Sequence, residues 1–326
     1  MHTLKKLLVA LSKILGYTTP KYTKKEVKLL ETKLKKLHFI IAILLLIIAI
    51  AVYYSFSFKR YAVFAGYNPD GIIKPYVLTY LKGLEEVTDG IVYITDSKLN
   101  KGEEEKLKSL NIIYQQHIPH NEYDWGSYKR GYNWLKANGY LSKSNELIFA
   151  NDSTYAPITS FKPMFITMFL KPYLDFWGDL KNNNQTPHLQ SYFLVFRPKV
   201  FNSEVFNNFI NNITAQKTRN DYINEYEIPL TATLSQYDFK WDCYIPYDKL
   251  SDYPLNDKHT HPVKLIKDHN HQFIKRRTFT DGMVVLENPK DILLFLQTNY
   301  PKTYQDIINS SNIKAKNPPS YLKEKI

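Results

Sequence analysis

An uninterrupted apolar segment near the N-terminus constrains this chain more than any other feature. Residues 39–56 carry no charged side chain, and a helix of that length is about 27 Å long at a rise of about 1.5 Å per residue. The hydrocarbon core of a bilayer is about 30 Å thick, so the segment predicts a transmembrane or membrane-inserted helix. A cleaved signal peptide is not expected, because its apolar region would begin near residue 1 and a small-residue cleavage site would follow it.

The segment before this run is basic. Residues 1–38 hold ten lysines against Glu26 and Glu31, so they contribute +8 of the net charge of +12 and leave +4 for the rest of the chain. Leu4, Leu8 and Leu11 recur at helical spacing among the lysines, which predicts a basic amphipathic helix on an anionic membrane. A surface helix packed on its own domain is the alternative.

Charge and cysteine content exclude several classes of protein. No zinc-finger spacing, RNP-like aromatic motif or continuous basic helix occurs in the body of the chain, so no nucleic-acid partner is expected. Cys243 is the only cysteine, which makes a disulfide bond within the chain impossible.

After Lys59, short apolar runs alternate with helical stretches. This alternation is typical of an α/β domain with a mostly parallel sheet. Residues 59–300 are assigned to that domain, and residues 301–326 to a C-terminal helix and tail. The expected strands are residues 61–67, 90–95, 111–116, 146–150 and 192–196, and the expected helices are residues 72–86, 103–110 and 127–138.

Polar side chains directly follow one of these strands. Asn151, Asp152 and Ser153 come after the apolar residues 146–150. Ligands of open α/β sheets bind beyond the carboxyl ends of the strands, and a carboxylate placed there can hold a divalent cation against phosphate groups. Asp152 is therefore predicted to be a ligand of Mn²⁺ or Mg²⁺, with a simple turn as the alternative.

Seven segments of the chain resemble, in order, the rhamnan synthesis protein F family, whose members are glycosyltransferase-like proteins of bacterial rhamnan, O-antigen and capsule synthesis. The resemblance covers residues 60 to about 280. The segments are FAGYNPDG (64–71), YDWGSYKRG (123–131), FANDSTYAPI (149–158), DFWG (175–178), HLQSYFLVF (188–196), YEIPLT (226–231) and FIKRR (273–277).

The resemblance implies a Rossmann-like domain of the GT-A type, a nucleotide-sugar donor and a lipid-linked glycan acceptor. The product would be a surface polysaccharide of the rhamnan, capsule or lipopolysaccharide O-antigen type. One departure from the wider GT-A pattern stands out, because the usual Asp-x-Asp metal motif has two carboxylates and this chain offers Asn151 and only Asp152. Metal dependence is therefore an open expectation.

Six residues are assigned to the donor site through this resemblance. Asp124 would bind the ribose or the base, Gly126 would let the backbone approach the donor, and the cationic residues would bind the leaving diphosphate. A helix N-cap at Asp124 and a solvated basic strand end at residues 275–277 are the alternatives. The donor set is Asp124, Gly126, Asn151, Asp152, Lys275 and Arg276.

The remaining assignments concern the acceptor and the chemistry. An inverting transferase needs a carboxylate near the acceptor hydroxyl, and Glu227 and Asp175 are the two nominees for this general base. Trp177 is expected to stack on a sugar, with an aromatic core residue as the alternative. His188 and Gln190 alternate on one face of a strand and are expected to share the acceptor cleft with it.

Two functions of different classes follow. The first is an inverting glycosyltransferase at the bacterial inner membrane, with membrane lipids as partners and a cytoplasmic catalytic domain, although the lysines before residue 39 favour the opposite orientation of that domain. The second is a catalytically inert scaffold that binds glycans and keeps the same fold. A hydrolase is a third interpretation, and it would need Asp175 and Glu227 about 5–10 Å apart.

Overall fold

The structure is a computed structural model that describes residues 23–183, 185–250, 258–279 and 287–310. The chain divides into two compact units, Met1–Phe58 and Lys59–Ile326. The amphipathic helix predicted for residues 4–15 lies outside the described residues.

The described part of the first unit is the single helix α2, Lys24–Ser57. It begins with a capping box, in which the Glu26 backbone N–H donates to Thr23 Oγ1 (3.3 Å) and the Thr23 N–H donates to Glu26 Oε2 (2.7 Å). Helix α2 includes the apolar residues 39–56, so the segment is helical as predicted, whereas its predicted insertion in a membrane is not confirmed. Among the described helices, none combines the length and the apolar character that crossing a membrane requires.

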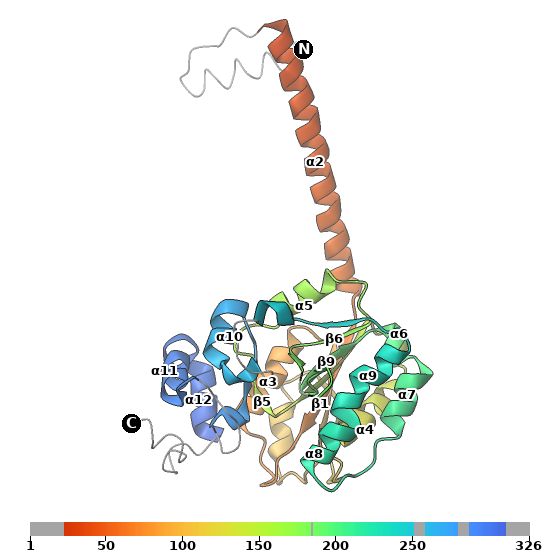
Figure 1. Cartoon of the computed structure of the whole chain (residues 1–326), viewed down its shortest axis with the longest axis vertical. Coiled ribbons are helices and arrows are strands. Elements are labelled where there is room, and N and C mark those ends of the chain that lie inside the picture. The colour runs from red at the N-terminus through yellow and green to blue at the C-terminus, as the bar shows by residue number, and fades with distance from the viewer. Residues whose placement is uncertain (1–22, 184, 251–257, 280–286, 311–326) are drawn as a thin grey trace. The chain divides into compact units, whose positions relative to one another are not determined.

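The second unit is built on a seven-stranded sheet with the order β10-β6-β9-β4-β1-β2-β3. Figure 1 shows helices on both sides of this sheet. The predicted mostly parallel sheet is confirmed, because β1 is parallel to both β2 and β4, and β2 is parallel to β3. Only β9 runs antiparallel to its neighbours β4 and β6. The strands are β1 (Arg60–Gly66), β2 (Gly90–Thr95), β3 (Ile112–His117), β4 (Glu146–Asn151), β6 (Phe176–Gly178), β9 (Phe193–Phe196) and β10 (Trp241–Cys243).

Helices cover both faces of this sheet, which is why its central strands are apolar throughout rather than alternating. In β1, Phe64 packs in one hydrophobic cluster with α3, whereas Val63 and Ala65 pack in the other with α4. The first face carries α3 (Pro75–Glu85), α5 (Lys162–Phe169), α10 (Pro262–His269), α11 (Pro289–Asn299) and α12 (Pro301–Ser310). The second carries α4 (Tyr123–Ala137), α6 (Pro198–Phe201), α7 (Glu204–Asn211) and α9 (Ile228–Gln236).

Two small sheets and several short turns complete the unit. Strand β11 (Ile274–Lys275) pairs with β5 (Thr154–Tyr155), and β7 (Lys181–Asn182) pairs with β8 (His188–Leu189). The helix expected at residues 103–110 is a short 3₁₀ helix, Glu103–Leu107. The C-terminal helix α12 belongs to this unit, since Thr79 Oγ1 of α3 donates to Asp306 Oδ2 (2.7 Å).

Candidate functional site

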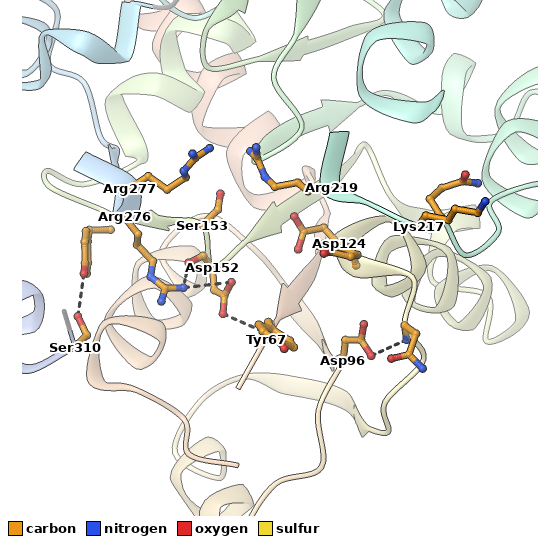
Figure 2. Close-up of a pocket in the computed structure, with 15 residues that line it drawn as sticks. Tyr67, Asp96, Asp124, Asp152, Ser153, Lys217, Arg219, Arg276, Arg277 and Ser310 are labelled. Carbon is orange, nitrogen blue, oxygen red and sulfur yellow. Dashed lines mark hydrogen bonds and ion pairs between the residues drawn. The ribbon is translucent and has the colours of Figure 1, made fainter. Parts of the chain in front are cut away.

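A pocket of about 690 Å³ lies at the carboxyl ends of three adjacent parallel strands (Figure 2). Tyr67 follows β1, Asp96 follows β2 and Asp152 follows β4, and all three line the pocket. The start of α4, the loop before α8 (Arg219–Tyr222) and the end of β11 supply the other walls. The pocket therefore occupies the edge of the sheet at which α/β proteins bind ligands.

Asp152 is held by the protein on both sides of its carboxylate. It is 5% exposed, and its Oδ2 accepts hydrogen bonds from the Tyr67 N–H (2.9 Å) and from the Tyr76 hydroxyl (3.5 Å). Its Oδ1 lies 3.9 Å from Arg276 Nη1. Burial raises the pKa of Asp152 above its ordinary value, and the positive charge of Arg276 opposes that rise.

Asp124 is the second carboxylate of the pocket, and Asn151 orients it. Asn151 Nδ2 donates to Asp124 Oδ2 (2.7 Å), while Asn151 Oδ1 accepts from the Ser153 N–H (3.1 Å) and hydroxyl (2.6 Å). Burial raises the pKa of Asp124 to about 7, and the nearby charge of Asp152 adds to the rise. Asp124 can therefore gain and lose a proton near neutral pH. It lies inside the first turn of α4, whose N-cap is Glu122.

Asp96 is the third carboxylate, and the sequence analysis missed it. Its Oδ1 accepts from the backbone N–H groups of His120 (2.5 Å) and Asn121 (2.9 Å). These bonds hold a strained loop, since Asn121 has a φ of 56° and Tyr123 a φ of 51°, values that non-glycine residues adopt mainly at functional sites and tight turns. Asp96 directly follows the predicted strand 90–95, so the strand-end rule applied to Asp152 would have found it.

Gly126 is buried inside α4 and does not line the pocket. A Cβ atom there would lie 2.3 Å from the Glu122 Cβ and 2.8 Å from His120 Nδ1. The predicted role in admitting the donor is wrong, because the missing side chain makes room for the 120–122 loop. Gly66, at the end of β1, is the glycine that does line the pocket.

The late basic segment reaches the predicted strand-end loop. The Arg276 N–H donates to the Ser153 carbonyl (2.9 Å), and Lys275 pairs with Thr154 across the small β5–β11 sheet. Arg276 lines the pocket together with Arg277, Lys217 and Arg219. Lys275 does not line it, because its Nζ lies 3.8 Å from the centroid of the Tyr192 ring.

Glu227 and His188 lie together beside the pocket rather than in its lining. Glu227 precedes α9, as predicted, and its Oε2 accepts from the N–H (3.0 Å) and the hydroxyl of Ser191. His188 Nε2 lies 3.9 Å from Glu227 Oε1. The negative charge of Glu227 contributes to the raised pKa of Asp124, so Glu227 belongs to the electrostatic surroundings of the site.

Asp175 lies at the opposite edge of the sheet. Strand β6 runs in the same direction as β4, because both are antiparallel to β9, and Asp175 precedes β6. Its Oδ2 accepts from Lys199 Nζ (2.9 Å) and from the Lys240 N–H (2.8 Å). The structure therefore does not bring the nominated base Asp175 to the pocket.

Asp175 and Glu227 are bonded to opposite ends of β9, so the length of this strand separates them. Glu227 is bonded to Ser191 before this strand, and the Asp175 carbonyl accepts from the Arg197 N–H (2.9 Å) after it. Six residues of extended chain span about 20 Å. The two carboxylates are too far apart for the hydrolase interpretation, which needs about 5–10 Å.

The residues assigned to the acceptor are buried. Trp177 is 0% exposed and packs against Phe165 and Phe193. It has no face exposed to a sugar, so the structure favours the alternative of an aromatic core residue. His188 and Gln190 are buried as well, and neither lines the pocket.

The described residues around Asp152 do not by themselves form a metal-binding cluster. Among residues 23–183, 185–250, 258–279 and 287–310, no group of three or more His, Cys, Asp and Glu side chains is placed to hold a metal ion. The position of the second carboxylate of an Asp-x-Asp motif is taken by Asn151, whose side-chain oxygen accepts from Ser153.

Comparison with known proteins gives one family and several distant structures. The sequence matches rhamnan synthesis protein F over residues 91–325, and no curated protein matches it. A cytidylyltransferase from Leptospira borgpetersenii is 12% identical with a TM-score of 0.37, covering 78% of this chain and 98% of its own. A glycosyltransferase involved in glycosylation of the major capsid of PBCV-1 is 11% identical with a TM-score of 0.36, and the match covers 69% of this chain and 96% of that protein. S. aureus TarS 1–349 in complex with UDP is 14% identical with a TM-score of 0.32, and the match covers 48% of this chain and 52% of that protein.

Proposed function

We propose that this chain, which belongs to the rhamnan synthesis protein F family, is a GT-A type glycosyltransferase that moves a sugar from a nucleotide donor to a growing bacterial surface polysaccharide. One observation carries the proposal. Asp96, Asp124 and Asp152 share a pocket with Arg276 at the carboxyl edge of a mostly parallel sheet. That edge is where α/β proteins bind nucleotides, and guanidinium groups suit a diphosphate.

The pocket walls differ in chemistry, which suggests how a donor lies in it. Tyr67 and Tyr123 line the pocket and are 56% and 48% exposed, so their rings are available to a nucleobase. We place the base near these rings, the diphosphate near Arg276, and the sugar near Asp124.

We assign the general base to Asp124. In inverting transfer, a base removes the proton of the acceptor hydroxyl as its oxygen bonds to the anomeric carbon, and the bond from that carbon to the diphosphate breaks with its electron pair on the phosphate oxygen. A base works best when its pKa lies near the working pH, and the pKa of Asp124 is about 7. Glu227 is the weaker nominee, because it does not line the pocket, whereas Asp124 does.

A panel of UDP-, GDP-, dTDP- and CMP-sugars tests this function through thermal unfolding of the protein. The matching donor is expected to raise the free energy of unfolding by about 2.7 kcal/mol at 100 times its Kd. Incubation with that donor and a glycan acceptor should then release the nucleotide. Stabilisation by glycans alone, with no response to any donor in the panel, would establish the inert scaffold instead.

We further propose that residues 1–58 hold the protein at the bacterial inner membrane, with the catalytic unit in the cytoplasm and a lipid-linked acceptor nearby. Two features support this. Residues 1–38 carry a net charge of +8, which suits anionic lipids. Between Leu37 and Ile47, α2 also exposes nine large apolar side chains, more than a soluble surface usually carries.

A shortened chain of residues 58–326 is expected to fold, because the second unit begins at Lys59. The Lys59 N–H donates to Asn145 Oδ1 (2.8 Å), and its Nζ lies 2.7 Å from Asp89 Oδ1. The shortened chain should unfold cooperatively but lose sedimentation with vesicles of anionic lipid, which the full chain keeps. A chain starting at Val63 serves as the control and should aggregate, because it lacks half of the central strand β1. Equal vesicle binding by the full chain and the 58–326 chain would refute the attachment.

A further inference from the structure

We infer that arginine side chains, Arg276 and Arg219, neutralise the diphosphate of the donor in place of a divalent cation, and that Asp152 positions Arg276. This inference rests on the proposed function and specifies how its donor is held. It also changes the role of Asp152 from a metal ligand to a positioning residue.

The pocket carboxylates are already engaged by protein donors. Asp152 Oδ2 accepts from the Tyr67 N–H, and Asp152 Oδ1 faces Arg276. Asp96 Oδ1 accepts from two backbone N–H groups of the 120–121 loop. Asp124 Oδ2 accepts from Asn151. Among the described residues, no three metal-binding side chains converge here, so a cation would have to rely on these already engaged carboxylates and on the donor itself.

Asn151 shows why the strand end is a poor cation site. An amide oxygen can replace a carboxylate as a ligand of Mg²⁺ or Mn²⁺, but Asn151 Oδ1 accepts from both the backbone N–H and the hydroxyl of Ser153. Its Nδ2 donor points at Asp124 (2.7 Å). The amide thus fixes the general base and the following turn rather than facing a metal.

Arg276 is anchored so that its guanidinium stays in the pocket. Its Nη1 donates to the Asp152 carbonyl (3.1 Å), and its Cζ lies 4.8 Å from the centroid of the Tyr76 ring. The side chain remains 37% exposed, and Figure 2 shows it reaching from β11 to Asp152. A guanidinium has five N–H donors in a planar fork, so the anchored group keeps donors for phosphate oxygens.

Arg219 supplies positive charge from the opposite wall. It lies at the start of α8, is exposed, and extends toward the middle of the pocket in Figure 2. Burial and the charge of Asp152 raise the pKa of Asp124, and the positive charge of Arg219 partly opposes that rise. Arg219 and Asp124 therefore interact electrostatically. With Arg277 and Lys217, four cations line the pocket against three acids, a net charge of +1. This balance suits a polyanionic ligand without an added cation.

Calorimetric titration of the full chain with UDP, GDP, dTDP and inorganic pyrophosphate tests the inference. In EDTA, at least one of these probes should bind with a Kd within about twofold of that measured in Mn²⁺. Arg276→Gln should weaken this binding at least tenfold, as loss of a charge-assisted bond does. The affinity of Arg276→Lys should lie between those of the unmodified protein and Arg276→Gln, because lysine keeps the positive charge but cannot donate from a planar fork.

Two further variants separate positioning from simple loss of charge. Asp152→Asn should weaken probe binding about threefold to tenfold, because Arg276 loses its partner. Lys199→Gln removes one positive charge at the opposite edge of the sheet and should leave binding unchanged. Thermal unfolding of each variant confirms that it is folded.

The outcomes distinguish the inference from the function on which it rests. Binding that EDTA abolishes and Mn²⁺ restores, with Arg276→Gln unaffected, would overturn the inference and leave the transferase standing. Failure of every probe to bind in both buffers would overturn the proposed function and the inference together.

Discussion

Replacing Asp124 by Asn is expected to reduce sugar transfer by about 10²- to 10⁴-fold, the usual contribution of a general base. The amide keeps the size of the carboxylate and can still accept the hydrogen bond from Asn151 Nδ2. The fold and the pocket should therefore survive, while the group that takes the proton is lost. In the unmodified protein, transfer should rise with pH through about 7, the pKa of Asp124.

The same change is expected to stabilise the protein above neutral pH. The pKa of Asp124 is raised from 3.8 to about 7 in the folded state, so the folded chain binds this proton more tightly than the unfolded chain does. Asp124 therefore makes its full contribution to the free energy of unfolding below pH 3.8, and this contribution is lost as the pH rises through about 7. Asn is uncharged at every pH and so avoids the cost of burying a carboxylate. The variant should therefore gain roughly 1–3 kcal/mol in free energy of unfolding at pH 8.5 and almost nothing at pH 4.

Urea denaturation at the two pH values, together with a transfer assay, checks both effects. Asp175→Asn is the matched control, because it changes another aspartate whose carboxylate is bonded to Lys199 at the opposite edge of the sheet. This control should keep its transfer activity. A fully active Asp124→Asn variant would remove Asp124 from the chemistry.

Trp177→Ala is expected to destabilise the fold by about 3–5 kcal/mol, the usual cost of removing a large buried aromatic side chain. The ring is 0% exposed and lies edge-on to Phe165, with ring centroids 5.2 Å apart. Its Nε1 lies 3.5 Å from Glu146 Oε1. Since a domain has only about 5–15 kcal/mol of stability in total, the variant should melt about 10 °C lower.

Thermal melting of three variants distinguishes a packing role from a sugar-binding role. Trp177→Phe should recover much of the lost stability, because it refills part of the cavity. Tyr67→Ala should melt almost like the unmodified protein, because Tyr67 is 56% exposed, but should bind the donor more weakly. If Trp177→Ala melted normally and lost only glycan affinity, the sugar-stacking role would be restored.

Local patterns predicted the elements of the fold well. The run ELIFA before Asn151 specified both a buried strand and the place where it ends, and β4 covers Glu146–Asn151. The helix expected at residues 103–110 was less accurate, because the structure has only a short 3₁₀ helix there. The basic amphipathic segment at residues 4–15 remains a prediction.

The sequence by itself determined the α/β class, the strand boundaries and the strand-end position of Asp152, because periodicity and turn residues act over a few neighbours along the chain. The tertiary structure determined which of these residues lie next to one another. Arg276 meets Asp152 only because β11 pairs with β5. Asp175 lies away from the pocket because it precedes β6, which runs in the same direction as β4, so that Asp175 is at the opposite edge of the sheet. Trp177 is buried because helices cover both faces of the sheet. Such long-range pairing depends on how separate elements pack together, and a short motif does not record it.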